Sequence, residues 1–374
     1  MTKPVNKIEK LIAELCPEGV EWKTLGEVCE MKAGKSISTS DISSSRSEEN
    51  IYPCIGGNGS RGYVNSFSHS GKFPIIGRQG ALCGNVCFAE GKFYATEHAV
   101  VVKPGEQFIA RFLYHLLVLM NLNQYASGGA QPGLAVSNLE KIKIAIPPLA
   151  VQQEIVEILD TFTTLEAELE AELEARKKQY EYYRDELLTF GDDVEWKTLG
   201  EIAVNLDSQR HPVTKSAREP GNIPYYGASG IVDYVSDYIF DGDYLLVSED
   251  GANLLARSTP IAFSVSGKTW VNNHAHVLQF PSYAERRFVE IYLNSIDLSL
   301  YVSGAAQPKL NQANLNKIPI PIASLAEQER IVTILDKFDA LVNDISVGLP
   351  AELNARRKQY EYYRDKLLTF PKKQ

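Results

Sequence analysis

The sequence predicts an α+β protein in which two globular domains are joined by two long antiparallel helices that form a coiled-coil spacer, as a pseudo-two-fold tandem repeat. Three observations predict this fold. Long segments recur once in the same order, the regions between them are rich in β-forming residues and turns, and each such region is followed by a helical pattern of apolar residues. A chain of 374 residues can hold two or three domains that each bury a core.

Four pairs of segments establish the repeat. They are VEWKTLGE at Val20–Glu27 and Val194–Glu201, SGGAQPGL at Ser127–Leu134 and SGAAQPKL at Ser303–Leu310, IVEILDTF at Ile155–Phe162 and IVTILDKF at Ile331–Phe338, and 20-residue segments at Ala171–Phe190 and Ala351–Phe370. The last pair is identical at 17 of 20 positions. Between the paired segments, similarity falls to isolated matches such as His98 with His274. The chain is therefore a tandem duplication with similar ends and diverged middles.

The repeat divides the chain into four regions. Residues 1–146 form a first globular domain with a short N-terminal helix, 147–190 a first spacer helix, 191–319 a second globular domain and 320–374 a second spacer helix. The globular regions contain β-rich runs between turns of Gly, Asn and Ser, which indicates an α+β domain with exposed loops. These runs are Phe73–Gly77, His98–Val102, Asp243–Ser248 and Ala275–Phe280.

The spacer helices are predicted from the spacing of apolar residues. From Leu149 to Leu188 they recur every three, four or seven positions, which is typical of a coiled-coil seam. A Pro-rich segment precedes each helix, because proline is tolerated at a helix start but not inside it. The second copy has four additional residues near Val347–Pro350, so Pro350 is expected to kink or interrupt that helix. The helical tyrosines are expected to pack in the spacer: Tyr180, Tyr182, Tyr183, Tyr360, Tyr362 and Tyr363.

The short connection after Phe190 limits how these regions can be arranged. The second domain is expected to begin at the far end of the first helix, because few residues separate them. The second helix can then bury its apolar seam only by running antiparallel along the first, which brings the C-terminus near the start of the chain. The repeat is therefore predicted to be circular, with the N-terminal helix preceding the first copy as the long helix precedes the second.

In this order, the motifs resemble the specificity (S) subunits of type I restriction-modification systems. The resemblance covers nearly the whole chain, from EWKTLGE through a diverged domain and SGGAQPGL to an I-P-P-L-x-x-Q-x-x-I helix start, and then again with IASLAEQ in place of IPPLAVQ. It implies that each diverged domain binds one half of a bipartite site in double-stranded DNA. It also implies that the helices set the half-site separation, that two methyltransferase subunits dock on the chain, and that restriction-translocase subunits join the complex.

The chain is not expected to be an enzyme, and no catalytic residue, cofactor or metal is assigned to it. Gly34-Lys35-Ser36 lacks the earlier glycine of a phosphate-binding loop, and no N-P-P-Y or D-P-P-Y segment occurs that could hold a flipped adenine. Methylation and cleavage are therefore expected from partner subunits. The alternative hypothesis is a non-catalytic coiled-coil scaffold that presents two protein-binding domains, but divergence confined to the domain interiors favours DNA recognition.

The charge of the chain at first argues against a nucleic-acid partner. The net charge is −9, with a pI of about 5.4. Residues 1–146 carry a net +2, 147–190 a net −7, 191–319 a net −5 and 320–374 a net +1. Glutamates between Glu166 and Glu174 on the first spacer helix are expected to face solvent or a basic surface of a methyltransferase. The second domain would need a local basic patch to contact DNA.

Polar side chains in or beside Gly-rich loops are the candidate DNA contacts. Lysine can bind phosphates, and arginine and glutamine can form paired hydrogen bonds with guanine or adenine. In the first domain the candidates are Lys32, Lys35, Asn58, Arg61, Arg78, Gln79 and Gln131. In the second domain they are Arg210, His211, Lys215, Ser229, Arg257, Gln307 and Lys309. Gln131 and Gln307 occur in the AQP motif of both copies, which favours a structural or backbone-contact role.

Cys83 and Cys87 are expected to be buried free thiols, and the five cysteines together are not expected to form disulfides. They are odd in number and lie in the first quarter of the chain, which is not a disulfide framework. Cys83, Cys87 and His98 lack the second ligand pair of a typical zinc site. The sequence has neither an 18-residue apolar run nor a signal peptide, so we expect a cytoplasmic protein without a membrane partner.

Overall fold

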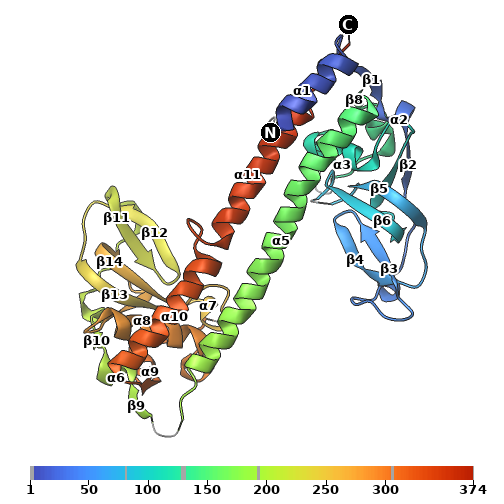
Figure 1. Ribbon diagram of the computed structural model, residues 1–374. Coiled ribbons are helices and arrows are strands. Elements are labelled where there is room, and N and C mark those ends of the chain that lie inside the picture. The colour runs from blue at the N-terminus through green and yellow to red at the C-terminus, as the bar shows by residue number, and fades with distance from the viewer. Residues whose placement is uncertain (1–3, 81, 128–131, 192–193, 305–306, 374) are drawn as a thin grey trace. The chain divides into compact units, whose positions relative to one another are not determined.

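A computed structural model describes residues 4–80, 82–127, 132–191, 194–304 and 307–373 (Figure 1). The chain divides into two compact units. Unit 1 comprises Met1–Glu170 with Glu352–Gln374, and unit 2 comprises Ala171–Ala351. Each unit contains one globular body together with segments of the long helices, so each helical region contributes to both units.

Each unit is built on a mixed six-stranded sheet, and equivalent strands occupy equivalent places in the two sheets. The order in unit 1 is β2 (Cys29–Ala33), β7 (Ala99–Pro104), β5 (His69–Gly77), β6 (Val86–Ala95), β3 (Tyr52–Gly56) and β4 (Gly59–Val64). The order in unit 2 is β10 (Val204–Asn205), β15 (Ala275–Gln279), β13 (Phe240–Ser248), β14 (Ala262–Val271), β11 (Pro220–Gly227) and β12 (Gly230–Val235). The β3–β6 and β11–β14 pairs are parallel and the others antiparallel. Each of the four predicted β-rich runs overlaps a strand of these sheets, with only His98 and Phe280 outside the strand ends.

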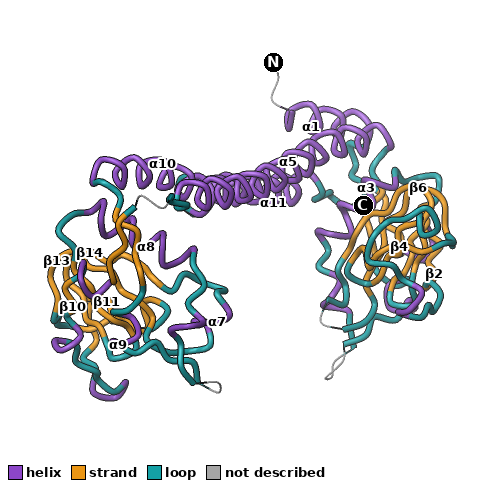
Figure 2. Tube along the Cα trace, turned by 90° about the horizontal axis from the view of Figure 1, so that it is seen from below, coloured by secondary structure: helices purple, strands orange, loops and turns teal. Residues whose placement is uncertain are grey.

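One longer helix covers each sheet, and its apolar face forms the core. In unit 1 this is α3 (Ala110–Leu119), which buries Phe112 and Leu113, and in unit 2 it is α8 (Tyr283–Ser295). Figure 2 shows the strands of each body gathered together, with these helices beside them. The shorter helices are α2 (Leu25–Val28), α4 (Val136–Leu139), α6 (Leu199–Ile202), α7 (Asn253–Ala256) and α9 (Gln312–Leu315), and the 3₁₀ turns are Thr39–Asp41, Leu122–Tyr125, Asp207–Gln209, Lys215–Ala217 and Ser299–Tyr301.

The repeated VEWKTLGE segment forms a strand followed by a helix cap. Its EWKT residues form β1 (Glu21–Thr24) and β9 (Glu195–Thr198), which pair with β8 (Lys143–Ile146) and β16 (Pro319–Ile322) just before the long helices. The backbone N–H of Thr24 donates to Glu27 at 2.7 Å, and Thr198 donates to Glu201 in the same way, so both copies form a capping box. The repetition of this motif therefore has a structural explanation.

The long helices pack in antiparallel pairs within each unit. Helix α5 (Leu149–Leu187) is continuous, whereas the second helical region is divided into α10 (Leu325–Asn343) and α11 (Leu349–Leu367). Pro350 lies in the first turn of α11, which confirms the predicted interruption. In unit 1, Phe162 of α5 stacks on Tyr363 of α11 with ring centroids 5.3 Å apart. In unit 2, the rings of Tyr183 and Phe338 are 5.6 Å apart.

Most of the acidic charge on α5 is paired within the chain. Arg357 of α11 binds Glu166 at 2.6 Å and Glu170 at 2.5 Å, all within unit 1. Two further glutamates pair along α5 itself, Glu172 with Arg176 and Glu174 with Lys177. Fewer unpaired glutamates than the sequence suggested are therefore left on α5 to bind a basic surface of a partner.

The segments near the two ends of the chain pair with each other in unit 1, as the circular repeat predicts. The N–H of Val20 donates to the carbonyl of Pro371 at 2.9 Å, and the N–H of Lys373 donates back to Val20. Leu367 and Phe370 enter the core of unit 1 as Leu187 and Phe190 pack against the core of unit 2. The end of α11 thus occupies the place that the end of α5 has in unit 2.

Helix α1 (Pro4–Leu15) is an additional element beside this helix pair. Ile8 is buried in the core of unit 1, and Lys7 binds Glu154 at 2.5 Å. The N-terminal helix precedes VEWKTLGE in sequence as α5 does, but α11 and not α1 is the spatial counterpart of the α5 end.

A joint of charged and aromatic residues fixes each sheet-covering helix to the long helices. In unit 1, Arg111 of α3 donates to Asp160 of α5 at 2.7 Å, and His115 lies between Asp160 and Tyr360, at 2.7 and 3.0 Å. A neutral His115 can donate from Nε2 to Asp160 and accept the Tyr360 hydroxyl at Nδ1. Burial raises the pKa of Tyr360 to about 12, so its hydroxyl keeps the proton that it donates to His115.

Unit 2 repeats the arginine–aspartate part of this joint with different supporting residues. Arg287 of α8 donates to Asp336 and Asp339 of α10, each at 2.7 Å. Burial acts to lower the pKa of Arg287, but the charges of Glu290, Asp336 and Asp339 raise it above its usual value. The position of His115 is occupied by Ile291, which is buried.

The glutamine of the helix-start motif is a buried backbone clamp. Gln152 is fully buried, accepts the N–H of Ile109 at 2.8 Å, and donates to the carbonyls of Gln107 and Pro147 at 2.7 and 2.8 Å. Its counterpart Gln328 donates to Ala323 at 2.9 Å, but its buried Oε1 has no partner among the described residues. The two copies of the motif therefore differ in how fully the glutamine is satisfied.

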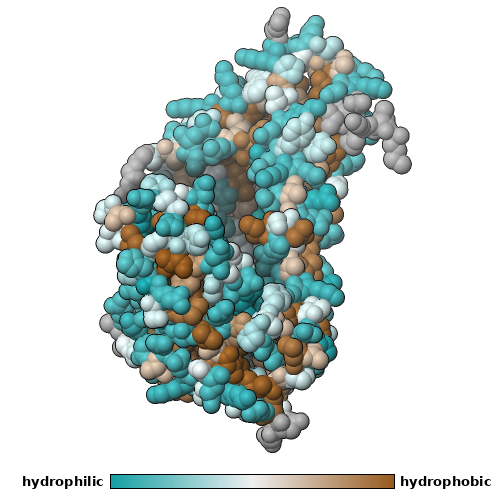
Figure 3. Space-filling view, turned by 90° about the vertical axis from the view of Figure 1, so that its left-hand side faces the viewer, coloured by the Kyte–Doolittle hydropathy of each residue, from teal (hydrophilic) through white to brown (hydrophobic). Residues whose placement is uncertain are grey.

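Other expectations about the chain can be checked directly. All five cysteines are free thiols, of which Cys29, Cys54 and Cys83 are buried, and burial raises the pKa of Cys29 and Cys87 to about 11. Among the helices described, none has the length and apolar character needed to cross a membrane. Hydrophilic side chains cover most of the face in Figure 3, with hydrophobic ones scattered between them.

We expect Gln152→Ala to lower the free energy of unfolding of unit 1 by about 2–4 kcal/mol, because each lost hydrogen bond contributes about 0.5–1.5 kcal/mol. Gln328→Ala is the matched control and should cost unit 2 roughly 1–2 kcal/mol less, because it removes fewer bonds. Hydrogen exchange of β7 and β15, followed through urea unfolding, measures the two units separately. Equal losses in both variants would contradict the clamp.

The His115 joint predicts a pH dependence of stability in unit 1. Burial lowers the pKa of His115, against the opposing effect of Asp160, so the folded state holds it neutral. The contribution of neutral His115 to the free energy of unfolding is then complete above its unfolded pKa of about 6.5. It is lost as the pH falls from there toward the lower pKa of His115 in the folded state. We expect His115→Ile, which copies Ile291, to reduce the difference in Tm between pH 7.5 and 5.5. Burial also lowers the pKa of His69, so part of the Tm difference should remain in this variant.

Ile291→Val in unit 2 is the control and should leave the pH dependence as it is in the unmodified chain. An identical pH dependence in the His115→Ile variant would exclude His115 as its source.

Candidate functional site

The candidate site of unit 1 lies where β5 ends. Backbone hydrogen bonds hold the residues after this strand: Arg78 N–H donates to His98 at 3.0 Å, and Arg78 carbonyl accepts from Leu134 at 2.8 Å. Gln79 bridges to Gly133, so the loop after β5 lies against the end of the SGGAQPGL segment. Ser127 N–H donates to Gly133 carbonyl at 2.8 Å, so these two residues of the segment lie side by side.

We call these backbone contacts of Arg78, Gln79, His98, Gly133 and Leu134 the backbone frame of unit 1. Several of the predicted side chains meet in one cavity beside it. A hollow of about 470 Å³ is lined by residues of the β3–β4 turn, the loop after β5 and the loop before β7. Its polar lining is Asn58, Ser60, Arg61, Gln79 and His98. The structure thus brings together three of the seven predicted first-domain residues, all exposed, with both hydrogen-bond donors and acceptors.

Close packing of glycine forms one side of this cavity. A Cβ atom on Gly77 would lie 2.2 Å from the carbonyl oxygen of Gly57, so any side chain there would displace the β3–β4 turn. The next residue, Arg78, is half-buried. Its Nε has no hydrogen-bond partner among the described residues, which exclude 81 and 128–131. Arg78 therefore holds an unsatisfied donor beside the cavity.

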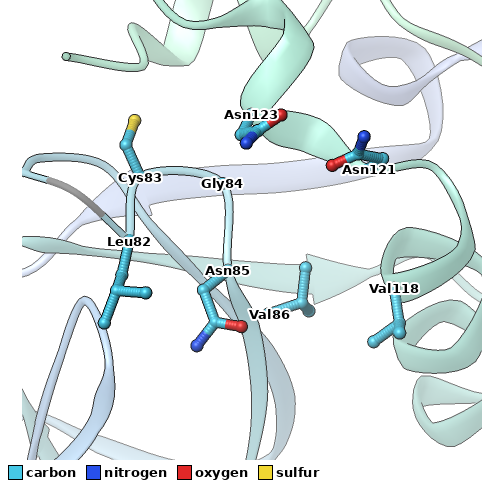
Figure 4. A pocket seen from close by; sticks show the side chains of 8 residues that line it. All are labelled: Leu82, Cys83, Gly84, Asn85, Val86, Val118, Asn121 and Asn123. Atoms are coloured by element: carbon cyan, nitrogen blue, oxygen red, sulfur yellow. The ribbon is translucent and has the colours of Figure 1, made fainter. Parts of the chain in front are cut away.

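A second hollow of about 260 Å³ adjoins the first and shares Leu82 with it. Figure 4 shows the loop from Leu82 to Val86 on one side and the side chains of Asn121 and Asn123 on the other. Asn85 in this loop donates to Asn58 at 3.2 Å, which connects the two hollows. Sequence analysis did not select these asparagines, because nothing in their sequence context places them near Asn58.

Unit 2 contains the same backbone frame with different side chains. Glu249 follows β13 as Arg78 follows β5: its N–H donates to His274 at 2.8 Å and its carbonyl accepts from Leu310 at 2.7 Å. Asp250 bridges to Lys309 as Gln79 bridges to Gly133. The hydrogen bonds therefore pair the residues Arg78 with Glu249, Gln79 with Asp250, His98 with His274, and Gly133 with Lys309.

The first residue of this frame is neutralised inside unit 2. Glu249 is buried and binds Arg210 at 2.7 Å and Lys309 at 3.1 Å. Burial acts to raise its pKa, but Arg210, His276 and Lys309 hold it below the usual value. Arg210 also donates to the carbonyl of Ala275 and has only 13% of its side chain exposed, so it supports the loop from inside. We leave Arg210 out of the proposed DNA contacts for this reason.

Asp207, Glu249 and His276 could in principle hold a metal, since their ligand atoms lie within 4.8 Å of one another. The guanidinium of Arg210 lies beside both carboxylates, at 2.7 Å from Glu249 and 3.4 Å from Asp207, and already supplies positive charge. The Nε2 of His276 donates to the Leu310 carbonyl at 2.7 Å, and its Nδ1 lies 2.5 Å from a carboxylate oxygen of Asp207. We therefore interpret the cluster as structural and assign no metal to it.

The exposed surface of this region in unit 2 carries a carboxylate and an imidazole. Asp250 has 18% of its side chain exposed, and His274 Nδ1 lies 2.8 and 3.0 Å from its two oxygens. Lys309 is half-exposed beside them, and Ser229 is exposed in the β11–β12 turn that corresponds to the turn holding Asn58. Asp250 and His274 were not among the candidates, although the match of His98 with His274 was the signal that could have found the pair.

The remaining candidates lie outside the two frames. Lys32 on β2 pairs with Glu30 at 2.5 Å, and Lys35 is exposed beside Thr96. His211 and Lys215 are exposed, and the His211 carbonyl accepts the indole N–H of Trp270 at 2.6 Å.

Arg257, Gln131 and Gln307 complete the set. The Arg257 guanidinium donates to the carbonyls of Leu293 and Ile296 after α8, at 3.3 and 2.6 Å, so the fold uses its donors and we do not retain it as a DNA contact. Gln307 is exposed in the turn next to Lys309, whereas Gln131 lies outside the described residues.

The helix tyrosines divide into an inner and an outer set. Tyr183 and Tyr363 pack against the partner helix of their own unit, as expected. Tyr182 and Tyr362 instead have 64% and 61% of their surface exposed and rest edge-on against the inner tyrosines. The prediction that all of these tyrosines pack was therefore wrong for the outer pair, because one position along a helix turns a side chain by 100°.

Comparison with known proteins gives consistent results. A family model described as the type I restriction modification DNA specificity domain matches residues 17–175 and again 191–355. The Haemophilus influenzae protein S.HindORF215P, assigned as a type I restriction enzyme specificity subunit, is 34% identical over 381 residues, covering 94% of this chain and 96% of its own.

Two solved structures share the fold. The S subunit of a type I restriction-modification system from M. genitalium has a TM-score of 0.67 at 17% identity, covering 94% of this chain and 96% of its own. A chain from a study of complex assembly and conformational transition of the type I system has a TM-score of 0.57 at 17% identity, covering 94% and 97%.

Proposed function

Because the chain belongs to the DNA specificity subunits of type I restriction-modification enzymes, we propose that each unit binds one half of a bipartite site in double-stranded DNA. The observation that carries this proposal is the pair of equivalent loop frames, one in each unit, which hold different polar side chains after equivalent strands of the two sheets. Equivalent surfaces with different donors and acceptors suit the recognition of two different half-sites.

The retained contacts fall into two chemical groups. Asn58, Arg61 and Gln79 in unit 1 present amide and guanidinium groups that can bind base edges. Lys32, Lys35, His211 and Lys215 are exposed and suit phosphate contacts, which position the protein without selecting a sequence. Unit 2 offers Ser229, Lys309 and Gln307 near its own frame.

The helices are proposed to set the half-site separation and to dock two methyltransferase subunits, with restriction-translocase subunits joining the complex. Methylation and cleavage would then come from these partners. The segment from Lys178 to Asp185 has the sequence KQYEYYRD, and the same sequence recurs from Lys358 to Asp365. Each copy exposes one tyrosine, Tyr182 or Tyr362. A surface that occurs once in each unit suits two copies of the same partner.

A coiled-coil scaffold with two protein-binding domains is the alternative function. It predicts no base preference for either unit, whereas the DNA-recognition function predicts two. The difference in side chains on an unchanged backbone frame favours DNA recognition, because a scaffold with two equivalent arms gives no reason for the loops alone to differ.

We expect cells that carry this gene and its methyltransferase to show one bipartite N6-methyladenine motif that disappears when the gene is deleted. Its half-sites should lie about one helical turn apart, centre to centre, because two linked domains on one face of DNA require that phase. Methylome sequencing of the two strains measures this. A methylome without any bipartite motif that depends on the gene would contradict the function.

The docking proposal predicts a change in stoichiometry. Tyr182→Ala and Tyr362→Ala should each reduce the bound methyltransferase from two copies to one, and the double variant should bind none, because buried tyrosines often dominate protein interfaces. Native mass spectrometry measures the stoichiometry. Tyr234→Ala is the control, since Tyr234 is similarly exposed but lies on β12. Two bound copies in the double variant would exclude these tyrosines as anchors.

A further inference from the structure

We propose that Gln79 and Asp250 determine the sequence specificity of the two units, with Gln79 contacting an adenine in one half-site and Asp250 a cytosine in the other. The inference rests on the proposed function, because it names the bases that the two DNA-binding surfaces recognise. Asp250 occupies in unit 2 the position that Gln79 has in unit 1.

The equivalence depends on backbone contacts that the two units share. The residue before each position donates to a histidine carbonyl, His98 or His274, and accepts from a leucine, Leu134 or Leu310. The glycine that follows donates to the carbonyl of the AQP proline at 3.1 Å in both units, Gly80 to Pro132 and Gly251 to Pro308.

Both of these glycines adopt positive φ, +83° for Gly80 and +111° for Gly251, so the chain turns in the same way after each position. Gln79 and Asp250 therefore leave the backbone at the same point of the fold. A backbone fixed on both sides in this way limits the motion of the side chain that it presents, as base discrimination requires.

Gln79 has the hydrogen-bonding groups that adenine requires. Its amide can accept from N6 and donate to N7 of adenine in one paired contact. It is exposed and lies in the hollow with Asn58 and Arg61, so the amide faces solvent-accessible space beside a cation that can hold a phosphate or a neighbouring guanine. Both frame positions that bridge in unit 1, Gln79 and Gly133, are uncharged, whereas the corresponding positions in unit 2 are Asp250 and Lys309.

Asp250 differs from Gln79 in its hydrogen bonding, because a carboxylate only accepts hydrogen bonds whereas an amide both donates and accepts them. The exocyclic N4 amino group of cytosine is the donor in the major groove that a carboxylate suits. His274 contacts both oxygens of Asp250 and so fixes its plane, while lone pairs on each oxygen stay available. Lys309 stands where unit 1 has Gly133, and its ammonium lies 3.1 Å from Glu249, so the buried carboxylate next to Asp250 adds little to the repulsion of the DNA phosphates.

Exchange of the two side chains tests the proposal in the assembled methyltransferase complex. Gln79→Asp, Asp250→Gln and the double exchange would each be used to select bound duplexes from a library with both half-sites randomised. We expect Gln79→Asp to replace adenine by cytosine at one position of the first half-site, with a change in preference of about ten- to a hundredfold. Asp250→Gln should replace cytosine by adenine at one position of the second.

Each single variant contains its own control, because the untouched half-site must be selected as in the unmodified protein. Ser70→Asp adds the same charge at the opposite end of β5, on an exposed position, and should leave both half-sites unchanged. Gln79→Asn keeps the amide and should retain adenine with a weaker preference, which separates a base contact from a folding effect.

The outcomes distinguish this inference from the proposed function. A bipartite motif in the unmodified protein that stays the same at every position in both single exchanges overturns the inference and leaves the function intact. Selection of no motif by the unmodified complex would instead contradict the function itself. A changed base at the expected position of one half-site, with the other half-site retained, supports both.

Discussion

The attachment of each sheet-covering helix to the long helices is the constraint on which the rest of the structure depends. Arg111 with Asp160, and Arg287 with Asp336, connect a half-buried guanidinium to a carboxylate at 2.7 Å. Truncating one member of such a pair leaves the other charge partly buried without a partner, which costs more than the pair contributes. The long helices also bury apolar residues in the core of each unit, such as Ile155 of α5 and Ile331 of α10, and the joint fixes the direction in which each sheet-covering helix packs on them.

The two units achieve different chemistry without different backbones. The hydrogen bonds of Arg78 and Glu249 to the neighbouring loops join main-chain atoms, so they tolerate a change of side chain at these positions. At Gly77 the backbones are too close for a side chain, whereas in unit 2 the equivalent Ser248 donates its hydroxyl to the Ala228 carbonyl. Stability therefore comes from the repeated segments, and recognition is left to a few projecting groups.

The order of the repeats and the β-rich runs were enough to predict the fold class, the antiparallel helix pairing and the interruption at Pro350, because these follow from periodicity and proline chemistry. The site was predicted only in part. Asn58, Arg61 and Gln79 could be selected because they lie in polar loops, and the structure brings them to one cavity, but their contact with DNA stays a prediction. Asp250 was missed because only the three-dimensional hydrogen bonds reveal that it occupies the position of Gln79. Arg257 was selected for its charge, although the α8 carbonyls use its donors.

The acidity of the second domain, which seemed to exclude DNA, also has a structural explanation. Asp207 and Glu249 are largely buried and bind Arg210, His276 and Lys309, so their charge is compensated within the fold. Burial acts to raise the pKa of Asp207, but His276 and Arg210 hold it below its usual value, so the group stays ionised and paired. Net charge summed over a domain counts such internal pairs equally with exposed groups. For the proposed function, what matters is instead the local arrangement around Asp250, whose carboxylate contacts the imidazole of His274.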